Sequence, residues 1–183
     1  IPRSFFAWNR VRRVRRLLPN PGKALDVGCG QGTFLRLLKK EGWECGGTEL
    51  SEKSAARALR LGIPVFTGQI NESSFQPHSF DLITFWHSFE HFGDPAAVLA
   101  AASRLLAPGG LLFISVPNRL SIEARMCRSG WFGLELPRHQ CTFTPPSLRR
   151  LLAGQGLRVR GISMNSLEYS IPMFMLTFYN WLG

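Results

Sequence analysis

Cysteines are few in this chain, and none is spaced for a paired metal or disulfide motif. The four lie at positions 29, 45, 127 and 141, with no Cys-x-x-Cys pair. A small disulfide-stapled scaffold and a zinc knuckle are therefore not expected. Because such cysteine usage is typical of a reducing compartment, we expect a cytoplasmic protein.

A hydrophobic run long enough to cross a membrane is also missing. The apolar stretch at residues 171–182 spans twelve residues and contains Pro172 and Asn180. It falls well short of the roughly 20 residues that a transmembrane helix needs. We expect a core element or a truncated membrane segment there. Since the chain begins at Ile1 rather than Met and stops inside an apolar run, we expect it to be part of a longer protein.

Acidic residues are scarce at the flanks of the sequence. Residues 1–23 hold seven Lys or Arg and no acid, and residues 119–160 hold eight Arg and two acids. Residues 24–118 hold seven bases and nine acids, so the net charge of +10 resides in the flanks. Such flanks suit a nucleic-acid enzyme or a protein that docks on an anionic membrane.

The basic N-terminal segment has the pattern of an amphipathic helix. Over residues 5–18 we expect Trp8, Val11 and Leu18 on one face and the arginines largely on the other. An arginine-rich helix is most often a solvated face, but the aromatic side of this one leaves peripheral membrane contact open.

Length and composition fit one globular domain. The 183 residues are 45% hydrophobic and 19% charged, which excludes disorder, collagen and coiled coil. From residue 24 onward, short β-like runs alternate with helical patterns, as in sheets built from βαβ units. We therefore predict a doubly wound, mostly parallel α/β sheet preceded by the N-terminal helix. The expected strands are residues 24–27, 44–48, 64–67, 80–85, 111–116 and 157–163.

Start and stop signals define the helices between these strands. Ser51, Asp94 and Thr144 are predicted N-caps, each followed by helical periodicity. The run Pro108-Gly109-Gly110 predicts a helix stop followed by a turn.

The expected organisation is a single domain over residues 1–183. It comprises the basic helix within residues 1–20 and a ligand-binding core over residues 24–116. Residues 119–143 are too long for an ordinary connection and are a candidate acceptor-side loop or lid.

The strongest motif follows the first predicted strand. Residues 25–34 read Leu-Asp-Val-Gly-Cys-Gly-Gln-Gly-Thr-Phe, and the three glycines allow a tight turn that a ligand can approach closely. A nicotinamide-type Gly-x-Gly-x-x-Gly would need glycine at 33, where Thr33 stands. The carboxylate of Asp26 would repel a pyrophosphate but suits a cationic aminoacyl end. A plain tight turn without a ligand is the alternative interpretation.

This motif resembles the Asp/Glu-x-Gly-x-Gly-x-Gly of the class I S-adenosylmethionine-dependent methyltransferases. The resemblance extends to Glu49 after the second strand, and to residues 80–84 and 106–111, which are similar to the family's fourth strand and to its turn and fifth strand. Within the family, the chain looks most like the ubiquinone-biosynthesis O-methyltransferases and their uncharacterised bacterial relatives. The resemblance implies a Rossmann-like methyltransferase fold of the seven-strand type, short of its last strand if the chain ends early.

The resemblance also implies S-adenosylmethionine as the cofactor, with Glu49 accepting both ribose hydroxyls. The family's third strand usually ends in Gly-Asp, whose acid binds the adenine amino group. Gln69 stands at that position, and its amide oxygen can accept the same hydrogen bond. The residues expected to surround the cofactor are Asp26, Gly28, Cys29, Gly30, Glu49, Leu50, Gln69, Ile70 and Phe85.

The run His87-Ser88-Phe89-Glu90-His91 has two chemical interpretations. As His-x-x-Glu-His it matches the inverted zinc-protease signature, but it follows a strand of the cofactor-binding sheet rather than lying in a long helix. It also resembles the Glu-x-x-Glu-His of the ubiquinone-type enzymes, which implies a divalent metal that holds the acceptor oxygen, here on His87, Glu90 and His91. Two imidazoles and one carboxylate favour a transition metal over magnesium. In the alternative, Glu90 and His91 cap the next helix without metal.

The predicted loop at residues 119–143 resembles the same bacterial enzymes at Pro137-Arg138-His139. Its aromatic residues Trp131 and Phe132, with one cation and one imidazole, suit a planar or anionic acceptor. Equally, these aromatic residues could fill the domain's own core. His139 and His87 are the candidate bases.

The function that we predict is S-adenosylmethionine-dependent methyl transfer to a small-molecule acceptor, at an oxygen, by in-line displacement at the sulfonium methyl. A nucleic-acid methyltransferase would explain the basic flanks, but its Asn-Pro-Pro-Tyr/Phe and Pro-Cys signatures are absent after the fourth strand. A module that binds the cofactor without consuming it is a third possibility. The expected partner is therefore a small molecule rather than a nucleic acid, with peripheral membrane contact through the N-terminal helix left open.

Overall fold

The computed structural model describes residues 3–72 and 75–164, which fall into two compact units. We call Ile1–Ser88 with Ala100–Ser115 the sheet unit, and Phe89–Leu99 with Val116–Gly183 the loop unit. The apolar run at 171–182 lies outside the described residues. Within the described part of the chain, none of the helices has both the length and the apolar character of a membrane span.

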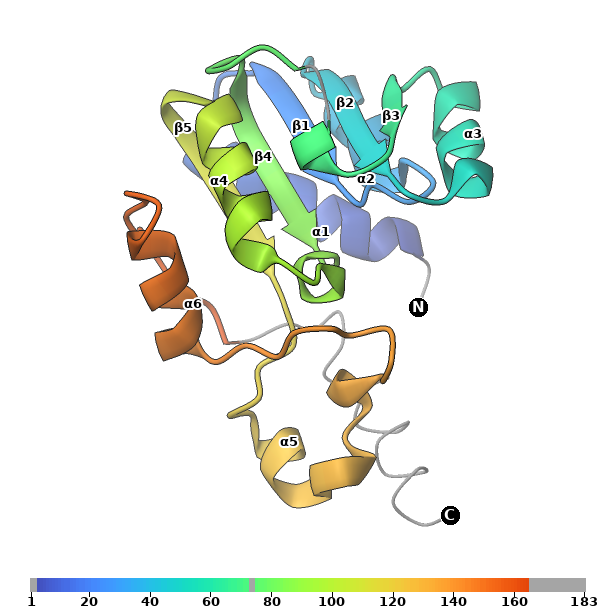
Figure 1. The fold of residues 1–183 in the computed structure, drawn as a ribbon. Coiled ribbons are helices and arrows are strands. Elements are labelled where there is room, and N and C mark those ends of the chain that lie inside the picture. Colours follow the sequence, from blue (N-terminus) through green and yellow to red (C-terminus); the bar gives the residue numbers. More distant parts are fainter. Residues whose placement is uncertain (1–2, 73–74, 165–183) are drawn as a thin grey trace. The chain divides into compact units, whose positions relative to one another are not determined.

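The sheet unit is built on five parallel strands in the order β3-β2-β1-β4-β5 (Figure 1). Central strands of such sheets are buried on both faces and are therefore apolar almost throughout. In β4, Phe80–Trp86, every side chain but that of Asp81 is buried. The prediction of a doubly wound α/β fold is confirmed. The other strands are β1 Lys23–Val27, β2 Glu44–Glu49, β3 Val65–Thr67 and β5 Leu106–Ser115.

Two predictions about strands are wrong. Residues 157–163 form no strand, because a strand needs a neighbour for its backbone groups and none pairs with this segment among the described residues. The predicted turn at Pro108-Gly109-Gly110 lies inside β5. Its pairing with β4 advances from Phe80↔Leu106 to Leu82↔Leu111, so the Pro-Gly-Gly run is accommodated as an irregularity between two paired stretches.

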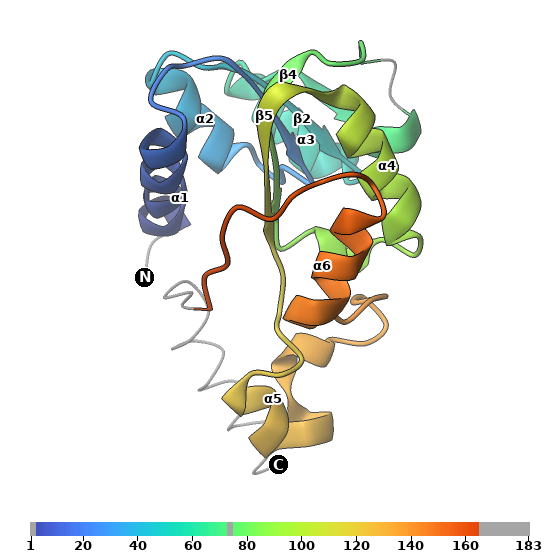
Figure 2. The ribbon, with the colours of Figure 1, turned by 90° about the vertical axis from the view of Figure 1, so that its left-hand side faces the viewer.

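Four helices pack around this sheet or lead into it. They are α1 Arg3–Leu17, α2 Thr33–Lys40, α3 Glu52–Arg60 and α4 Pro95–Leu105. Of α4, the part from Ala100 onward belongs to the sheet unit. Figure 2 shows α1 and α2 on one side of the sheet. The predicted caps are confirmed: the Ser51 hydroxyl accepts from the Ser54 amide, and Asp94 Oδ1 accepts from the Ala96 and Ala97 amides.

The face through which helix α1 packs was predicted in part: Val11 is buried and Leu18 packs against the core, but Trp8 lies outside this face. Its buried residues are Ala7, Val11 and Val14, whereas Trp8 is 50% exposed and stacks with the Arg12 guanidinium. Residues at i, i+4 and i+7 form one stripe on a helix, and a stripe that begins at a small alanine lets α1 approach α2 closely. The larger indole is left on the outer side.

The loop unit contains short helices and a closed loop. The segment predicted as a lid begins and ends at a parallel bridge, Asn118↔Phe143. Phe143 stacks on Phe89 with ring centroids 5.2 Å apart, and Trp131 is buried as well. For Trp131 and Phe143, burial within the loop unit supports the interpretation that the aromatic residues of this segment fill a core. The elements are η2 Phe89–His91, α5 Ile122–Cys127, η3 Arg128–Gly130, η4 Phe132–Leu134 and α6 Pro145–Ala153, capped at Thr144 as predicted.

Candidate functional site

The glycine loop after β1 has the backbone that its sequence requires. Gly28, Gly30 and Gly32 have φ values of 75°, 56° and 74°, a region that side chains with a Cβ rarely adopt. A Cβ on Gly28 would lie 2.5 Å from the Ser88 Cβ, whereas a Cβ on Gly30 would meet nothing within 4 Å. Gly28 is therefore required for packing, and Gly30 exposes backbone that a ligand can approach.

Glu49, at the end of β2, faces this loop. Its Oε2 accepts a hydrogen bond from the Gly30 amide at 2.8 Å, and its Oε1 accepts one from the Ser51 amide at 2.9 Å. Parallel pairing of β1 with β2 brings the two strand ends together, since Val27 is opposite Thr48. The carboxylate is thus oriented by two backbone donors beside the open face of the loop.

Asp26 lies beneath the loop and is almost fully buried. The Thr84 hydroxyl donates a hydrogen bond to its Oδ1 at 2.6 Å. Burial raises the pKa of this carboxyl to about 7, against the lowering effects of the Thr84 hydrogen bond and the Arg10 charge, with Glu49 adding a smaller rise. Through its hydrogen bond with Thr84, the Asp26 side chain links β1 to β4 directly before the glycine loop.

The remaining residues expected around the cofactor differ in exposure. The Cys29 side chain is buried against Gly47, and burial holds the pKa of its thiol far above the usual range. Ile70 and Phe85 have fully buried side chains, so their side chains pack in the interior. Leu50 is 63% exposed and Gln69 is half-buried.

His87 follows β4 in a strained backbone conformation, with φ 54°. Its amide donates to the Ser115 carbonyl at 2.9 Å, and its Nε2 lies 3.0 Å from the Ser115 hydroxyl. Ser115, the last residue of β5, was missed by sequence reasoning, because only the Trp86↔Ser115 register brings it beside His87. A non-glycine residue with positive φ at the end of a strand is a common feature of functional sites.

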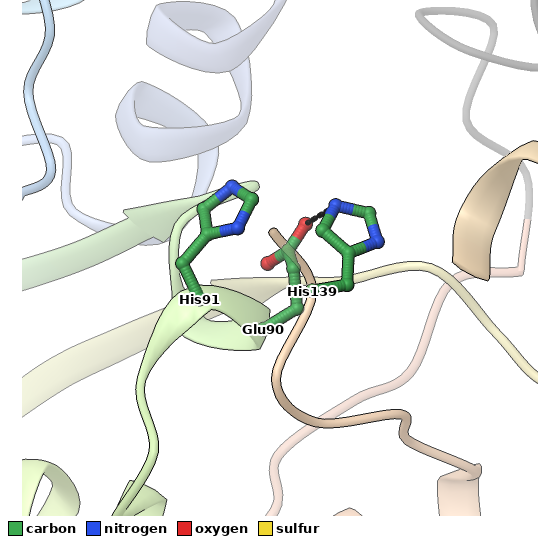
Figure 3. Close-up of side chains that lie close together, drawn as sticks. All are labelled: Glu90, His91 and His139. Carbon is green, nitrogen blue, oxygen red and sulfur yellow. Dashed lines mark ion pairs between the residues drawn. The ribbon is translucent and has the colours of Figure 1, made fainter. Parts of the chain in front are cut away.

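A second group of polar side chains lies in the loop unit. Glu90, His91 and His139 offer ligand atoms that all lie within 4.8 Å of one another (Figure 3). Glu90 is 1% exposed and His139 is 6% exposed. The Nε2 of His139 lies 3.9 Å from Glu90 Oε1 and 3.4 Å from Glu135 Oε2.

Backbone hydrogen bonds join the two segments that carry this cluster. The amides of Gln140 and Cys141 both donate to the Glu90 carbonyl, at 2.9 and 3.1 Å. The His91 Nδ1 lies 3.0 Å from the Arg138 carbonyl. These contacts bring His139 beside Glu90 although 49 residues separate them in the sequence.

The structure brings together two of the three residues expected to form a metal site, His87, Glu90 and His91. Glu90 and His91 come together as expected, but the third member of the cluster is His139, while His87 contacts Ser115 in the sheet unit. Glu135 was missed by the sequence analysis, because residues 136–138 form a turn rather than a helix and no helical or strand spacing links Glu135 to His139.

Comparison with known proteins matches residues 6–161 to a methyltransferase domain family. The chain is 40% identical over 104 residues to the ubiquinone biosynthesis O-methyltransferase of Methylococcus capsulatus, covering 53% of this chain and 44% of that protein. It is 31% identical to the enzyme of the same name from Idiomarina loihiensis, covering 80% of this chain and 67% of that protein. The chain therefore spans between about half and two thirds of the length of these relatives.

Solved structures share the fold at lower identity. A putative methyltransferase from Haloferax volcanii, solved in complex with the Trm112 activator, has a TM-score of 0.75 at 20% identity, covering 92% of this chain and 76% of that one. A Thermotoga maritima S-adenosylmethionine-dependent methyltransferase has a TM-score of 0.69 at 24% identity, covering 85% and 73%. The glycine loop, the parallel sheet and the extent of the family match lead to one conclusion: this chain belongs to the methyltransferase domain family.

Proposed function

We propose that the protein transfers the methyl group of S-adenosylmethionine to an oxygen of a small-molecule acceptor. The observation that carries this proposal is the Glu49 carboxylate, held beside the open Gly30 backbone by the Gly30 and Ser51 amides. A carboxylate at this distance after a glycine turn suits the two hydroxyls of a ribose. The names of the relatives, which are O-methyltransferases of ubiquinone biosynthesis, support oxygen as the atom that is methylated.

In this proposal the protein acts by alignment and by removal of one proton. In-line displacement requires the acceptor oxygen, the methyl carbon and the sulfonium sulfur to be collinear, and holding them so lowers the entropic part of the barrier. We propose His87 as the base, because it follows β4 at the same edge of the parallel sheet as the glycine loop and is fixed by Ser115. His139, the other expected base, lies among carboxylates, which suits a cation-binding role better.

The divalent metal implied by the resemblance belongs to the same proposal. Glu90 and His91 fit such an ion, since a buried carboxylate and an oriented imidazole are ordinary ligands. A metal bound there would supply Lewis-acid polarisation of the acceptor hydroxyl. In this role Glu90 and His91 would hold and orient the ion.

Peripheral membrane contact is a further part of the proposal. Helix α1 exposes Phe5 and Trp8, and its residues at 12, 13, 15 and 16 are exposed arginines. Aromatic side chains and arginines on one exposed helix surface suit the headgroup region of an anionic membrane.

Calorimetry and a product assay test the proposed reaction. S-adenosylmethionine and S-adenosylhomocysteine should bind the parent protein, and NAD should not. A screen of hydroxyl-bearing aromatic acceptors should then yield S-adenosylhomocysteine in step with the methylated product. Preference for NAD would contradict the cofactor assignment. Binding without turnover on any acceptor, or salt-sensitive binding of nucleic acid that stimulates turnover, would contradict the assigned reaction.

A further inference from the structure

We infer that Ser115 is a positioning residue for His87 and that it makes Nδ1 of the imidazole the atom that takes the proton of the methyl acceptor. This role rests on the proposed function, in which His87 is the base. Two contacts join the residues: the His87 amide donates to the Ser115 carbonyl at 2.9 Å, and His87 Nε2 lies 3.0 Å from the Ser115 hydroxyl. One residue of β5 thus holds both the backbone and the ring of His87.

The pairing of β4 with β5 is the reason that these two residues meet. Trp86 is opposite Ser115 in the parallel register, so His87 is the first residue beyond the paired part of β4. The chain then turns at His87 with φ 54°, a left-handed conformation that is costly for a residue with a Cβ. Such a conformation persists only where the surroundings determine it, and the two contacts with Ser115 do so.

The residue after His87 attaches the same turn to the glycine loop. The Ser88 hydroxyl donates to the Val27 carbonyl at 2.5 Å, and Val27 directly precedes Gly28. The turn that carries His87 is therefore fixed to β1 through Ser88 and to β5 through Ser115. This double attachment holds the imidazole in a constant position relative to the glycine loop.

The contact with Ser115 determines which ring nitrogen can act. Each imidazole nitrogen forms one hydrogen bond in the plane of the ring, through either its hydrogen or its lone pair. Nε2 of His87 uses this position on the Ser115 hydroxyl, so the acceptor hydroxyl must approach Nδ1. Nδ1 can take a proton only in the tautomer whose hydrogen is on Nε2. In that tautomer Nε2–H donates to the Ser115 oxygen, and this bond remains when the ring becomes an imidazolium.

The proton transfer leaves Ser115 unchanged. The acceptor O–H bond breaks, and its hydrogen moves as a proton to His87 Nδ1. The electron pair left on the oxygen forms the bond to the methyl carbon, while the carbon–sulfur bond breaks and its pair stays on sulfur. The imidazolium then returns its proton to water. Because Ser115 keeps its own hydrogen throughout, its hydroxyl orients the ring without passing on a proton.

Nitrogen-15 NMR of the full chain tests the tautomer without cofactor or acceptor. With histidine labelled, each of the four rings gives two nitrogen signals, and Nε2 is recognised by its couplings to both ring C–H protons. Spectra are recorded at about pH 8.5, roughly two units above the pKa of histidine in peptides, so that neutral rings are observed. The signals lost in His87→Asn, chosen because asparagine tolerates positive φ, belong to His87. They should show the hydrogen on Nε2.

Two variants of equal shape separate positioning from packing. Ser115→Thr keeps the hydroxyl, whereas Ser115→Val has a methyl group in its place. Ser115→Val should lower kcat about tenfold, the order expected for one lost hydrogen bond, with the KM for S-adenosylmethionine unchanged. Ser115→Thr should have the kcat of the parent. Ser79→Val is the control, since the Ser79 hydroxyl donates to the Gln76 carbonyl at 2.7 Å just before the other end of β4.

Each outcome identifies what has failed. A hydrogen on Nδ1 of His87 in the parent would overturn the inference and leave the proposed methyl transfer with a different base, and this measurement needs no variant of Ser115. Equal kcat values in Ser115→Val and Ser115→Thr would also overturn the positioning role. A parent that converts no acceptor contradicts the proposed function itself, and the role of Nδ1 falls with it.

Discussion

The Thr84 hydroxyl donates a hydrogen bond to the buried Asp26 carboxylate at 2.6 Å, from the neighbouring strand β4 to β1. This pair lies directly beneath the glycine loop, because Val27 and Gly28 follow Asp26 in the chain. Burial is the dominant influence on Asp26 and raises its pKa to about 7. The protonation state of the Asp26 carboxyl beneath the loop is therefore expected to change near pH 7.

Asp26→Asn should remove part of the pH dependence of stability. Between about pH 4 and pH 7 the folded protein holds a proton on Asp26 that the unfolded chain has lost, so stability falls as pH rises through this range and is level above it. A shift of about three pKa units corresponds to at most on the order of 4 kcal/mol. Thermal unfolding from pH 4 to 8 measures it. An equal pH slope in Asp26→Asn and the parent would contradict the assignment, and Asp81→Asn, at an exposed carboxylate, is the control.

Glu49→Ala should weaken binding of S-adenosylhomocysteine about tenfold to a hundredfold, since one charged hydrogen bond contributes roughly 1.5 to 3 kcal/mol. Glu44 lies on the same strand but at its other end, where it pairs with Lys23 at 3.0 Å. Glu44→Ala should therefore leave calorimetric affinity unchanged. Equal affinity in both variants would remove Glu49 from the proposed cofactor site.

Gly28→Ala should destabilise the protein more than Gly109→Ala. Both glycines have positive φ, 75° and 80°, so alanine costs about 1 to 2 kcal/mol in either place. Only at Gly28 does the added Cβ also meet Ser88, at 2.5 Å. Urea midpoints of the two variants measure the difference, and equal losses would show that Ser88 moves aside freely.

His87→Ala should lower turnover about 100- to 10,000-fold if His87 is the base, with little change in cofactor affinity. Ser115→Ala removes the group 3.0 Å from His87 Nε2 and should cause a smaller loss. Kinetics at saturating cofactor separate the two effects. The exposed His78 provides the control, and a parent-like rate in His87→Ala would exclude the role.

Replacement of Phe5 and Trp8 by serine should reduce sedimentation with vesicles rich in phosphatidylserine. Both side chains are about half exposed, so their loss should change stability by less than about 1 kcal/mol. Leu59→Ser, at an exposed site on α3, is the matched control. If the parent does not sediment with anionic vesicles at low salt, the proposed membrane contact is wrong.

Local signals in the sequence were sufficient for much of the fold. The caps at Ser51, Asp94 and Thr144 and the glycine turn at 28–32 depend on residues within a few positions of one another. Short β-like runs identified all five observed strands, and except at β5 the predicted limits differ from the observed ones by one residue at one end. The interpretation of the glycine loop needed no more than its spacing and its place after a strand.

Tertiary structure decided what depends on residues distant in sequence. Trp8 and Ala7 are both apolar by pattern, and only packing on α2 determines that Ala7 is buried and Trp8 is not. A strand at 157–163 was expected from its short β-like run, yet such a run does not supply a pairing partner. Likewise, His139 joins Glu90 and His91 through backbone hydrogen bonds between segments 49 residues apart, and no local pattern specifies such a pairing. Local conformation follows from steric limits and neighbouring side chains, whereas the composition of a site follows from long-range burial and hydrogen bonding that only the folded chain satisfies.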